Sequence, residues 1–311
     1  MQEQSSITVS SMTERIHSAR KRRPINFSWS AYLFLLPTFL AIGTFSYFPA
    51  IRALVGAFTT WNGFTPPVWV GLSNFVQALQ DPTLRQAAVH IFWWALIGIP
   101  IGLVPPFIAA ELIFHLRSST LQYLYRSAFV VSMVVPGVVS LLIWQFIYSP
   151  TGLLNVLFKD LGFPGLRHAW LANPHLALGS LILMGFPWVG AFALLIYYAG
   201  LNAIPQDIFD AAAVDGCEGI RRIWAIDFRL VLPQFKLLLV LSVLGVSQNL
   251  LTPLLMTDGG PGTATVTPGL YMFQAAINND QYGYSMAIAF LLFVVVMTLT
   301  VVNMKYFQTN D

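Results

Sequence analysis

The residues that most often do chemistry are sparse in this sequence and form no recognised catalytic or metal-binding pattern. The five histidines are spread along the chain without metal-ligand spacing: His17, His90, His115, His168 and His175. No serine, histidine and acid arrangement converges in a way that the topology predicted below allows. The phosphate-binding pattern G-x-x-x-x-G-K-[ST] is absent from the sequence. We therefore expect no catalytic residue, no metal site and no cofactor bound by this chain, so that any energy from ATP comes through a partner.

Uncharged polar and aromatic side chains within apolar segments are the better candidates for a functional site. They occur in two segments: Ser247, Gln248 and Asn249 midway along one, and Trp188, Phe192 and Tyr197 in the other. Amides can bind sugar hydroxyls and aromatic rings can stack on a sugar, without any fixed charge. Such residues also often serve as hydrogen-bonding contacts between membrane helices. A substrate pathway and helix packing both remain open for these six residues.

Glu111 is the clear ionisable residue inside a predicted membrane span. A charge there is costly and is usually kept for function, as in a proton relay. Glu111 lies close to one end of its span, near His115 and Arg117, so local pairing is favoured over proton transport. This scarcity of charge within the spans argues against an ion-coupled secondary transporter.

The composition indicates the element type that must position these residues. Of the 311 residues, 56% are hydrophobic and only 9% are charged, and the mean hydropathy is +0.67, which is too apolar for a soluble domain of this size. Apolar runs of roughly twenty residues are long enough to cross a bilayer as helices. We therefore predict an all-α polytopic membrane protein with six spans, at Ala31–Phe48 and at about Ala87–His115, Leu121–Tyr148, Leu176–Gly200, Leu237–Met256 and Tyr284–Tyr306.

The basic residues predict the orientation of these spans. With the amino terminus inside, twelve of the sixteen are cytoplasmic: Arg15, Arg20, Lys21, Arg22, Arg23, Arg117, Arg126, Arg221, Arg222, Arg229, Lys236 and Lys305. The other four are Arg52, Arg85, Lys159 and Arg167. We expect a multi-pass protein of the cell inner membrane with both termini cytoplasmic, a basic tail over residues 1–28 and a six-span domain over 29–311. The net charge of +3 follows this topology and indicates no nucleic-acid partner.

A polar stretch at residues 202–233 interrupts the apolar pattern and is predicted to lie in the cytoplasm. Pro205 suits the first position of a helix, and Asp207 and Asp210 lie near its positive end. Ala211–Ala213 favour helix and leave a flat face of small residues. Gly216 is a predicted stop, because glycine readily adopts the left-handed conformation that ends a helix. So short a helix is marginal in water unless another surface covers it, which predicts a docking element.

A second amphipathic pattern follows Gly216. Its apolar residues fall on one helical face and its arginines on another: Ile220, Ile223, Trp224 and Phe228 against Arg222 and Arg229. Pro233 marks the turn into the next apolar segment. We expect a second helix in front of the fifth span.

The order of these features resembles the EAA loop of the membrane subunits of ATP-binding-cassette importers. The residues that carry the match are Asp210, Ala211, Ala212, Asp215, Gly216, Leu232 and Pro233. Asp210 stands where the family usually has glutamate, and the interval from Gly216 to Pro233 is about four residues, or one helical turn, longer than usual. The resemblance implies that Pro205–Gly219 is the coupling helix, which sits in a cleft of the ATPase subunit with its small-residue face. The extra turn should lengthen the second helix without rotating its apolar stripe.

Other segments extend the resemblance from about Tyr32 to Phe307. LFLLPTFL, VGLSNF, VVPGVVSLLIWQFIYSPTGLLN and DGGPGTATVTPGLYMF are similar to the carbohydrate branch of these permeases. The resemblance implies a non-enzymatic subunit of a sugar importer, working with a second homologous permease, two cassette ATPases that use ATP and Mg²⁺, and an extracytoplasmic solute-binding protein. It also implies that Gln248 and Asn249 resemble a substrate-contacting polar pair. The alternatives are an ion-coupled secondary transporter and a polytopic membrane enzyme.

Overall fold

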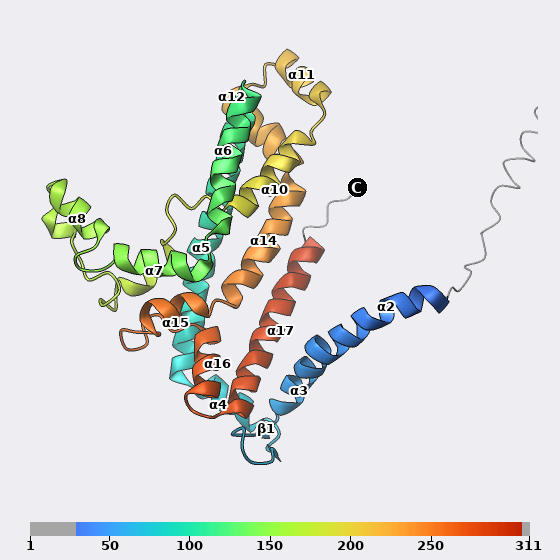
Figure 1. Cartoon of the computed structure of the whole chain (residues 1–311), viewed down its shortest axis with the longest axis vertical. Coiled ribbons are helices and arrows are strands. Elements are labelled where there is room, and N and C mark those ends of the chain that lie inside the picture. The colour runs from blue at the N-terminus through green and yellow to red at the C-terminus, as the bar shows by residue number, and fades with distance from the viewer. Residues whose placement is uncertain (1–28, 307–311) are drawn as a thin grey trace, which may run out of the picture. The chain divides into compact units, whose positions relative to one another are not determined.

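Residues 29–306 are described by a computed structural model, and nearly all regular structure in that range is helical (Figure 1). The predicted tail, residues 1–28, lies outside the described residues, as do residues 307–311. Backbone contacts divide the chain into two units, Met1–Ile51 and Arg52–Asp311. The all-α prediction is confirmed for the described range, apart from one short antiparallel pair of strands.

The first unit holds the first predicted span. Its helical course runs through α2 (Trp29–Ile42), the π-helical turn η1 (Gly43–Tyr47) and the beginning of α3 (Phe48–Gly56). The apolar side chains of this course are exposed, for example Phe34 and Phe45. An unbroken apolar helix without a covered face is what a lipid environment accommodates.

The second unit opens with a polar connection and one long helix. Its elements up to the end of that helix are β1 (Thr59–Thr60), β2 (Val68–Trp69), α4 (Ser73–Gln80) and α5 (Pro82–Phe114). At about 1.5 Å per residue, the 33 residues of α5 span about 50 Å, more than a bilayer core. The later elements are arranged around this helix.

The middle of the chain is more broken than predicted. The elements are α6 (Ser119–Val131), η2 (Ser132–Val134), α7 (Gly137–Ile147), α8 (Leu153–Asp160), η3 (Pro164–Leu166), α9 (Ala177–Ile182) and α10 (Ala191–Asn202). The predicted third span bends by 92° between η2 and α7. Pro136 explains the bend, because a residue before proline avoids helical angles, and Val135 is extended with φ −72° and ψ 121°.

The last part of the second unit holds the polar stretch and the remaining helices. They are α11 (Gln206–Val214), α12 (Gly219–Arg222), the π-helical turn η4 (Ile223–Asp227), α13 (Phe228–Leu230), α14 (Leu232–Ser247), α15 (Leu251–Thr257), α16 (Pro268–Ile277) and α17 (Tyr282–Tyr306). The predicted fifth span is therefore interrupted, and Gln248 and Asn249 lie at the break between α14 and α15. The predicted polar cluster thus coincides with a break in the helical course of this segment.

Three helices are long and apolar enough to cross a membrane, within the part of the chain that the structure describes. They are Leu33–Gly56, Pro82–Phe114 and Tyr282–Val302. Two bent pairs, with angles of 92° and 69°, raise the number to five if each pair is one span, and Ala191–Asn202 is a shorter apolar helix. The structure thus shows several span-capable helices, and the count of six remains a prediction.

The largest apolar core of the second unit joins α5, α10 and α14. Its buried residues are Leu103, Phe107, Ala110, Ile113, Leu194, Tyr197, Tyr198, Leu201, Val231 and Leu238. Gly200 brings α10 close to α14, since a Cβ there would lie 2.8 Å from the Gln234 side chain. Small residues at such crossings are typical of membrane helices, where close packing replaces the hydrophobic effect.

Asp81 ties the beginning of α5 to α16 and α17. Its carboxylate accepts hydrogen bonds from the backbone N–H of Thr83 (2.8 Å) and Leu84 (3.2 Å), which caps the helix. It also accepts from the hydroxyls of Tyr271 (2.5 Å) and Tyr284 (2.8 Å). Burial acts to raise the pKa of Asp81, but these hydrogen bonds outweigh it and hold the pKa below its usual value. Burial and the bond to Asp81 raise the pKa of Tyr271 to about 12.

We expect Asp81→Asn to destabilise the protein by about 1–3 kcal/mol at neutral pH, because it removes a charged helix cap that also receives two tyrosine hydroxyls. A depressed carboxyl pKa stabilises the fold above the unfolded-state value near pH 4, and this contribution is lost as the pH falls through the folded-state pKa. The difference from wild type in thermal unfolding should therefore shrink below about pH 4. Asp160→Asn, at an exposed carboxylate, is the control. A pH-independent difference would contradict the assignment.

Candidate functional site

A cavity of about 420 Å³ lies where α5, the α9–α10 connection and the α14–α15 break meet. Its lining is made of uncharged residues: Trp94, Gly98, Ile101, Gly102, Leu181, Ile182, Met184, Gly185, Trp188, Val189, Gly190, Val246, Asn249 and Thr252. Two of the six residues predicted for a substrate pathway, Trp188 and Asn249, are among them. The structure therefore brings together one aromatic side chain and one amide from segments about sixty residues apart.

Trp188 is held by a hydrogen bond within its own segment, and Asn249 by one from the N-cap residue of α16. The Trp188 indole N–H donates to the Leu183 carbonyl oxygen at 2.8 Å, and its φ of 60° is unusual for a bulky residue. The Asn249 carbonyl oxygen accepts from the Thr267 hydroxyl at 2.8 Å. Within residues 29–306, no hydrogen bond engages the side-chain amide of Asn249, which leaves it available to a ligand in the cavity.

Prolines in α5 add further polar groups to the same wall. Pro105 and Pro106 lie inside the helix and have no N–H, so the carbonyls four residues earlier lose their usual helical donors. Those carbonyls belong to Ile101 and Gly102, and both residues line the cavity. The hydrogen-bond acceptors that the prolines leave in these two residues carry no charge.

The other four predicted pathway residues lie elsewhere. The Ser247 hydroxyl donates to the Val243 carbonyl oxygen at 2.7 Å, and Gln248 and Phe192 are exposed. Tyr197 is 0% exposed and packs edge-to-face on Phe107, with ring centroids 5.4 Å apart. Rotation of each helix about its axis, which the sequence does not specify, decides which of these side chains meets the cavity.

The short helix predicted after Pro205 is present as α11, and its end is built as predicted. Gly216 has a φ of 65°, its N–H bonds to the Ala213 carbonyl and the Cys217 N–H bonds to the Ala212 carbonyl. This pair of bonds is a Schellman motif, which confirms the predicted left-handed stop. The helix starts one residue later than predicted, with Pro205 as its N-cap.

The faces of α11 differ from the expected arrangement. Ala212 is 5% exposed and lies on the inner side with Phe209, so its placement on the docking face was wrong. Asp210, whose carboxylate accepts from the Gln206 amide at 3.0 Å, is exposed, as are Ala211 and Asp215. Val214 is 88% exposed, so the outer face also carries an apolar side chain beside the carboxylates of Asp210 and Asp215.

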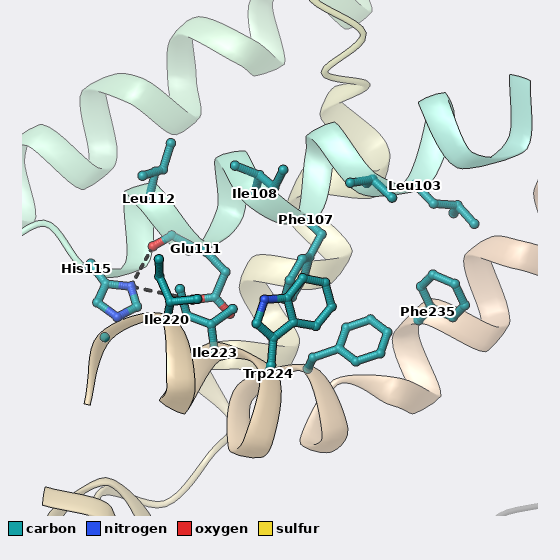
Figure 2. A pocket seen from close by; sticks show the side chains of 13 residues that line it. Leu103, Phe107, Ile108, Glu111, Leu112, His115, Ile220, Ile223, Trp224 and Phe235 are labelled. Atoms are coloured by element: carbon teal, nitrogen blue, oxygen red, sulfur yellow. Dashed lines mark hydrogen bonds and ion pairs between the residues drawn. The ribbon is translucent and has the colours of Figure 1, made fainter. Parts of the chain in front are cut away.

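A groove of about 690 Å³ separates α5 from the segment that follows α11 (Figure 2). The predicted apolar stripe lines it: Ile220, Ile223, Trp224 and Phe228. The common face of the stripe is thereby confirmed. The segment is not a regular helix, however, because η4 forms a π-helical turn between α12 and α13. Such turns accommodate an additional residue within a helix.

Four polar residues meet at one end of this groove. Ligand atoms of Glu111, His115 and Asp227 lie within 4.8 Å of one another, a separation at which a cation could be held. The Arg222 guanidinium bonds to Asp227 at 3.2 Å and to the His115 ring, so a positive charge of the chain itself already occupies the cluster. The predicted local pairing of Glu111 with His115 is present, with Oε2 of Glu111 3.5 Å from Nδ1 of His115. The arginine that contacts His115 is Arg222, 107 residues further along the chain, and not the neighbouring Arg117.

Comparison with known proteins places the chain in a family. The family model described as "Binding-protein-dependent transport system inner membrane component" matches residues 98–309. The chain belongs to this family. The permease is 30% identical to the probable ABC transporter permease protein YurN of Bacillus subtilis, over 90% of the chain and 96% of that protein. It is 27% identical to the sulfoquinovosyl glycerol transport system permease protein SmoG of Agrobacterium fabrum, over 90% and 91%.

A solved structure shares the fold of the permease. It is a bacterial alginate ABC transporter in complex with an alginate pentasaccharide-bound periplasmic protein, and it superposes with a TM-score of 0.76 at 19% identity, covering 88% of the permease and 92% of that chain. Members of the family are non-catalytic transport components, so the permease is a transport subunit and not an enzyme. It is a membrane protein with several apolar helices.

A substitution at Tyr197 tests whether this residue serves core packing or belongs to the substrate pathway. Its hydroxyl is buried without a hydrogen-bond partner within the described residues, so Tyr197→Phe removes an unsatisfied polar atom and keeps the ring on Phe107. We expect a thermal stability equal to or above that of the wild type, by up to about 1 kcal/mol, and unchanged transport. A large loss of transport with normal stability would return Tyr197 to the substrate pathway.

Proposed function

We propose that the permease is one transmembrane subunit of a binding-protein-dependent importer that carries a neutral carbohydrate, an oligosaccharide or a related sugar, by alternating access driven by ATP. The observation that carries the proposal is the uncharged cavity at Trp188 and Asn249. Its volume lies in the range of roughly 300–1,000 Å³ that is usual for small-molecule sites. An aromatic face and an uncharged amide suit a polyhydroxylated molecule, which can be bound by stacking and hydrogen bonds without a fixed charge.

The names of relatives support the substrate class. SmoG is named for sulfoquinovosyl glycerol, and MsmF of Streptococcus mutans, 26% identical over 91% of the chain, is named for multiple sugar-binding transport. The ion-coupled alternative is not favoured, because Arg222 already pairs with Asp227 in the charged cluster, and none of the cluster's residues lines the cavity. The polytopic-enzyme alternative has no support in a family of transport components.

The partners follow from the family description and from the exposed face of α11. We infer a second homologous permease subunit, two cassette ATPase subunits that bind ATP and Mg²⁺, and an extracytoplasmic solute-binding protein. Six spans, with α9 and α10 together forming the fourth, would put both termini in the cytoplasm. Figure 1 has α11 and α12 at the opposite end of the second unit from α4 and β1, which supports this orientation.

The docking helix α11 would couple the permease to ATP hydrolysis. Nine residues make a marginal helix by themselves, and its outer face carries Asp210, Ala211 and the exposed Val214. A cleft in the ATPase would cover Val214 and offer hydrogen-bonding or charged contacts to Asp210 and Asp215 at its edge.

The adjacent amides provide a matched test of the cavity. Asn249 lines it and Gln248 is exposed, so Asn249→Leu should lower sugar uptake about tenfold, the cost of about 1.4 kcal/mol for a lost hydrogen bond, while Gln248→Leu should change it less than twofold. The measurement is uptake into proteoliposomes containing the assembled complex, using the sugar that the purified solute-binding protein retains. Equal uptake in wild type and Asn249→Leu would mean that the sugar binds elsewhere.

The two faces of α11 allow a second matched test. Ala211→Trp places a bulky group on the outer face, so we expect the ATPase subunits to be lost on purification while the thermal stability of the permease stays unchanged. Ala212→Trp instead overpacks an inner position and should destabilise the permease itself, by about 1–3 kcal/mol. Retention of the ATPase and wild-type sugar-stimulated ATP hydrolysis in Ala211→Trp would show that α11 does not couple the two.

A further inference from the structure

Arg222 contacts three separate elements with three parts of one side chain. Its Nε donates to the Asp227 carboxylate of η4 at 3.2 Å, and its Nη2 donates to the Nε2 of His115. Its Cζ lies 4.8 Å from the centroid of the Phe209 ring, which belongs to α11. A guanidinium is suited to this arrangement because it is planar, stacks on aromatic rings and carries five donors in fixed directions.

The α5 side of this contact is built into the end of the helix. His115 is the C-cap of α5, and its Nδ1 donates to the Glu111 carbonyl oxygen at 2.8 Å, which leaves Nε2 as the acceptor for Arg222. Phe114 lies 5.7 Å from Phe209 between ring centroids. The last turn of α5 and the inner face of α11 are therefore joined by one ring contact and, through Arg222, by one charged contact.

The local charges make these contacts difficult to exchange for water. Asp227 is 0% exposed and Glu111 is 3% exposed. Glu111 Oε1 and Oε2 and Asp227 Oδ1 have no hydrogen-bond partner within the described residues. A buried carboxyl group is costly in its charged form unless a positive charge lies nearby, and Arg222 bonds to the Asp227 carboxylate in this cluster. Removing the guanidinium would leave Asp227 buried without this partner and would weaken the junction.

The helix that receives these contacts also lines the cavity. Gly102 is in the cavity wall and His115 ends α5, so the two are thirteen residues apart, or about 20 Å along the helix axis. Pro105 and Pro106 lie between them and weaken the helical hydrogen bonding at that level. A displacement of the last turn of α5 can therefore bend the helix next to the cavity wall.

We propose that Arg222 is a positioning residue for energy coupling: it locks the docking helix α11 to the end of α5, so that movement of α11 reaches the cavity. The inference rests on the proposed function, because it requires α11 to be the element that the ATPase moves. Apart from this junction, α11 is attached through its inward-facing residue Ala212 and through short connections to α10 and α12. Arg222 is the charged link among these attachments.

The test compares Arg222→Lys with Arg221→Lys in the assembled, reconstituted complex. Lysine keeps the charge but cannot bond to Asp227, His115 and the Phe209 ring at once, whereas Arg221 is an exposed neighbour. In Arg222→Lys we expect the ATPase subunits to co-purify and basal ATP hydrolysis to persist, while the sugar imported per ATP hydrolysed falls at least about tenfold. Arg221→Lys should keep the wild-type ratio. A purely structural role would lower the thermal stability and leave the ratio unchanged.

Phe209→Leu supplies a second variant, which removes the ring under Arg222 and keeps an apolar side chain. If the two residues act as one unit, the double variant should have the same ratio as either single variant. If the Arg222→Lys complex does not assemble, the sugar imported per ATP hydrolysed is measured in Phe209→Leu instead. If the variant that assembles imports as much sugar per ATP as the wild type, the proposed role of Arg222 is wrong. Absence of sugar uptake by the wild-type complex would instead overturn the proposed function.

Discussion

The packing of α5 against α10 and α14 is the constraint on which the rest of the second unit depends. Buried residues such as Ala110, Leu194 and Val231 fill this contact, and Gly200 lets α10 and α14 approach closely. In a membrane such contacts depend on shape, because lipid tails are as apolar as the side chains. One face of α5 is committed to this core, so its other features, the cavity wall and the charged end, have fixed positions relative to α10 and α14.

Prolines and glycines set where the helices break, and the breaks hold the polar groups. Pro136 bends the α6–α7 pair, Pro105 and Pro106 free carbonyls in α5, and Asn249 lies in the gap between α14 and α15. An unpaired backbone group is tolerated in a membrane helix only where protein or water satisfies it. Asn249, Ile101 and Gly102 all line the cavity, so its uncharged wall is made partly of residues at such breaks.

The charged groups are separated from the cavity and concentrated at the α5–α11 junction. Glu111 and His115 belong to the end of α5 on one side of the groove (Figure 2), and Arg222 and Asp227 belong to the α12–η4 segment. Placing the cation and the carboxylates together limits the desolvation cost of each. The cavity at Trp188 and Asn249 is lined by uncharged residues, whereas these charges lie beside α11.

The sequence by itself determined the features that depend on neighbouring residues. Composition established an all-helical membrane protein, Gly216 predicted the left-handed end of α11, and the spacing of Ile220, Ile223, Trp224 and Phe228 predicted their common face. The EAA-like pattern led to the family that the comparisons show. These predictions succeeded because helix ends and helical periodicity are local properties of the chain.

Tertiary structure alone decided which side chains of each helix meet. Trp188 and Asn249 share a cavity while Tyr197 is in the core, Ala212 points inward, and Arg222 reaches His115 across 107 residues of sequence. The rotation of each helix about its axis and the angle of each break follow from packing against other helices, which no local pattern specifies. Successive residues of a helix point in directions about 100° apart, so one can face the cavity while the next faces the core.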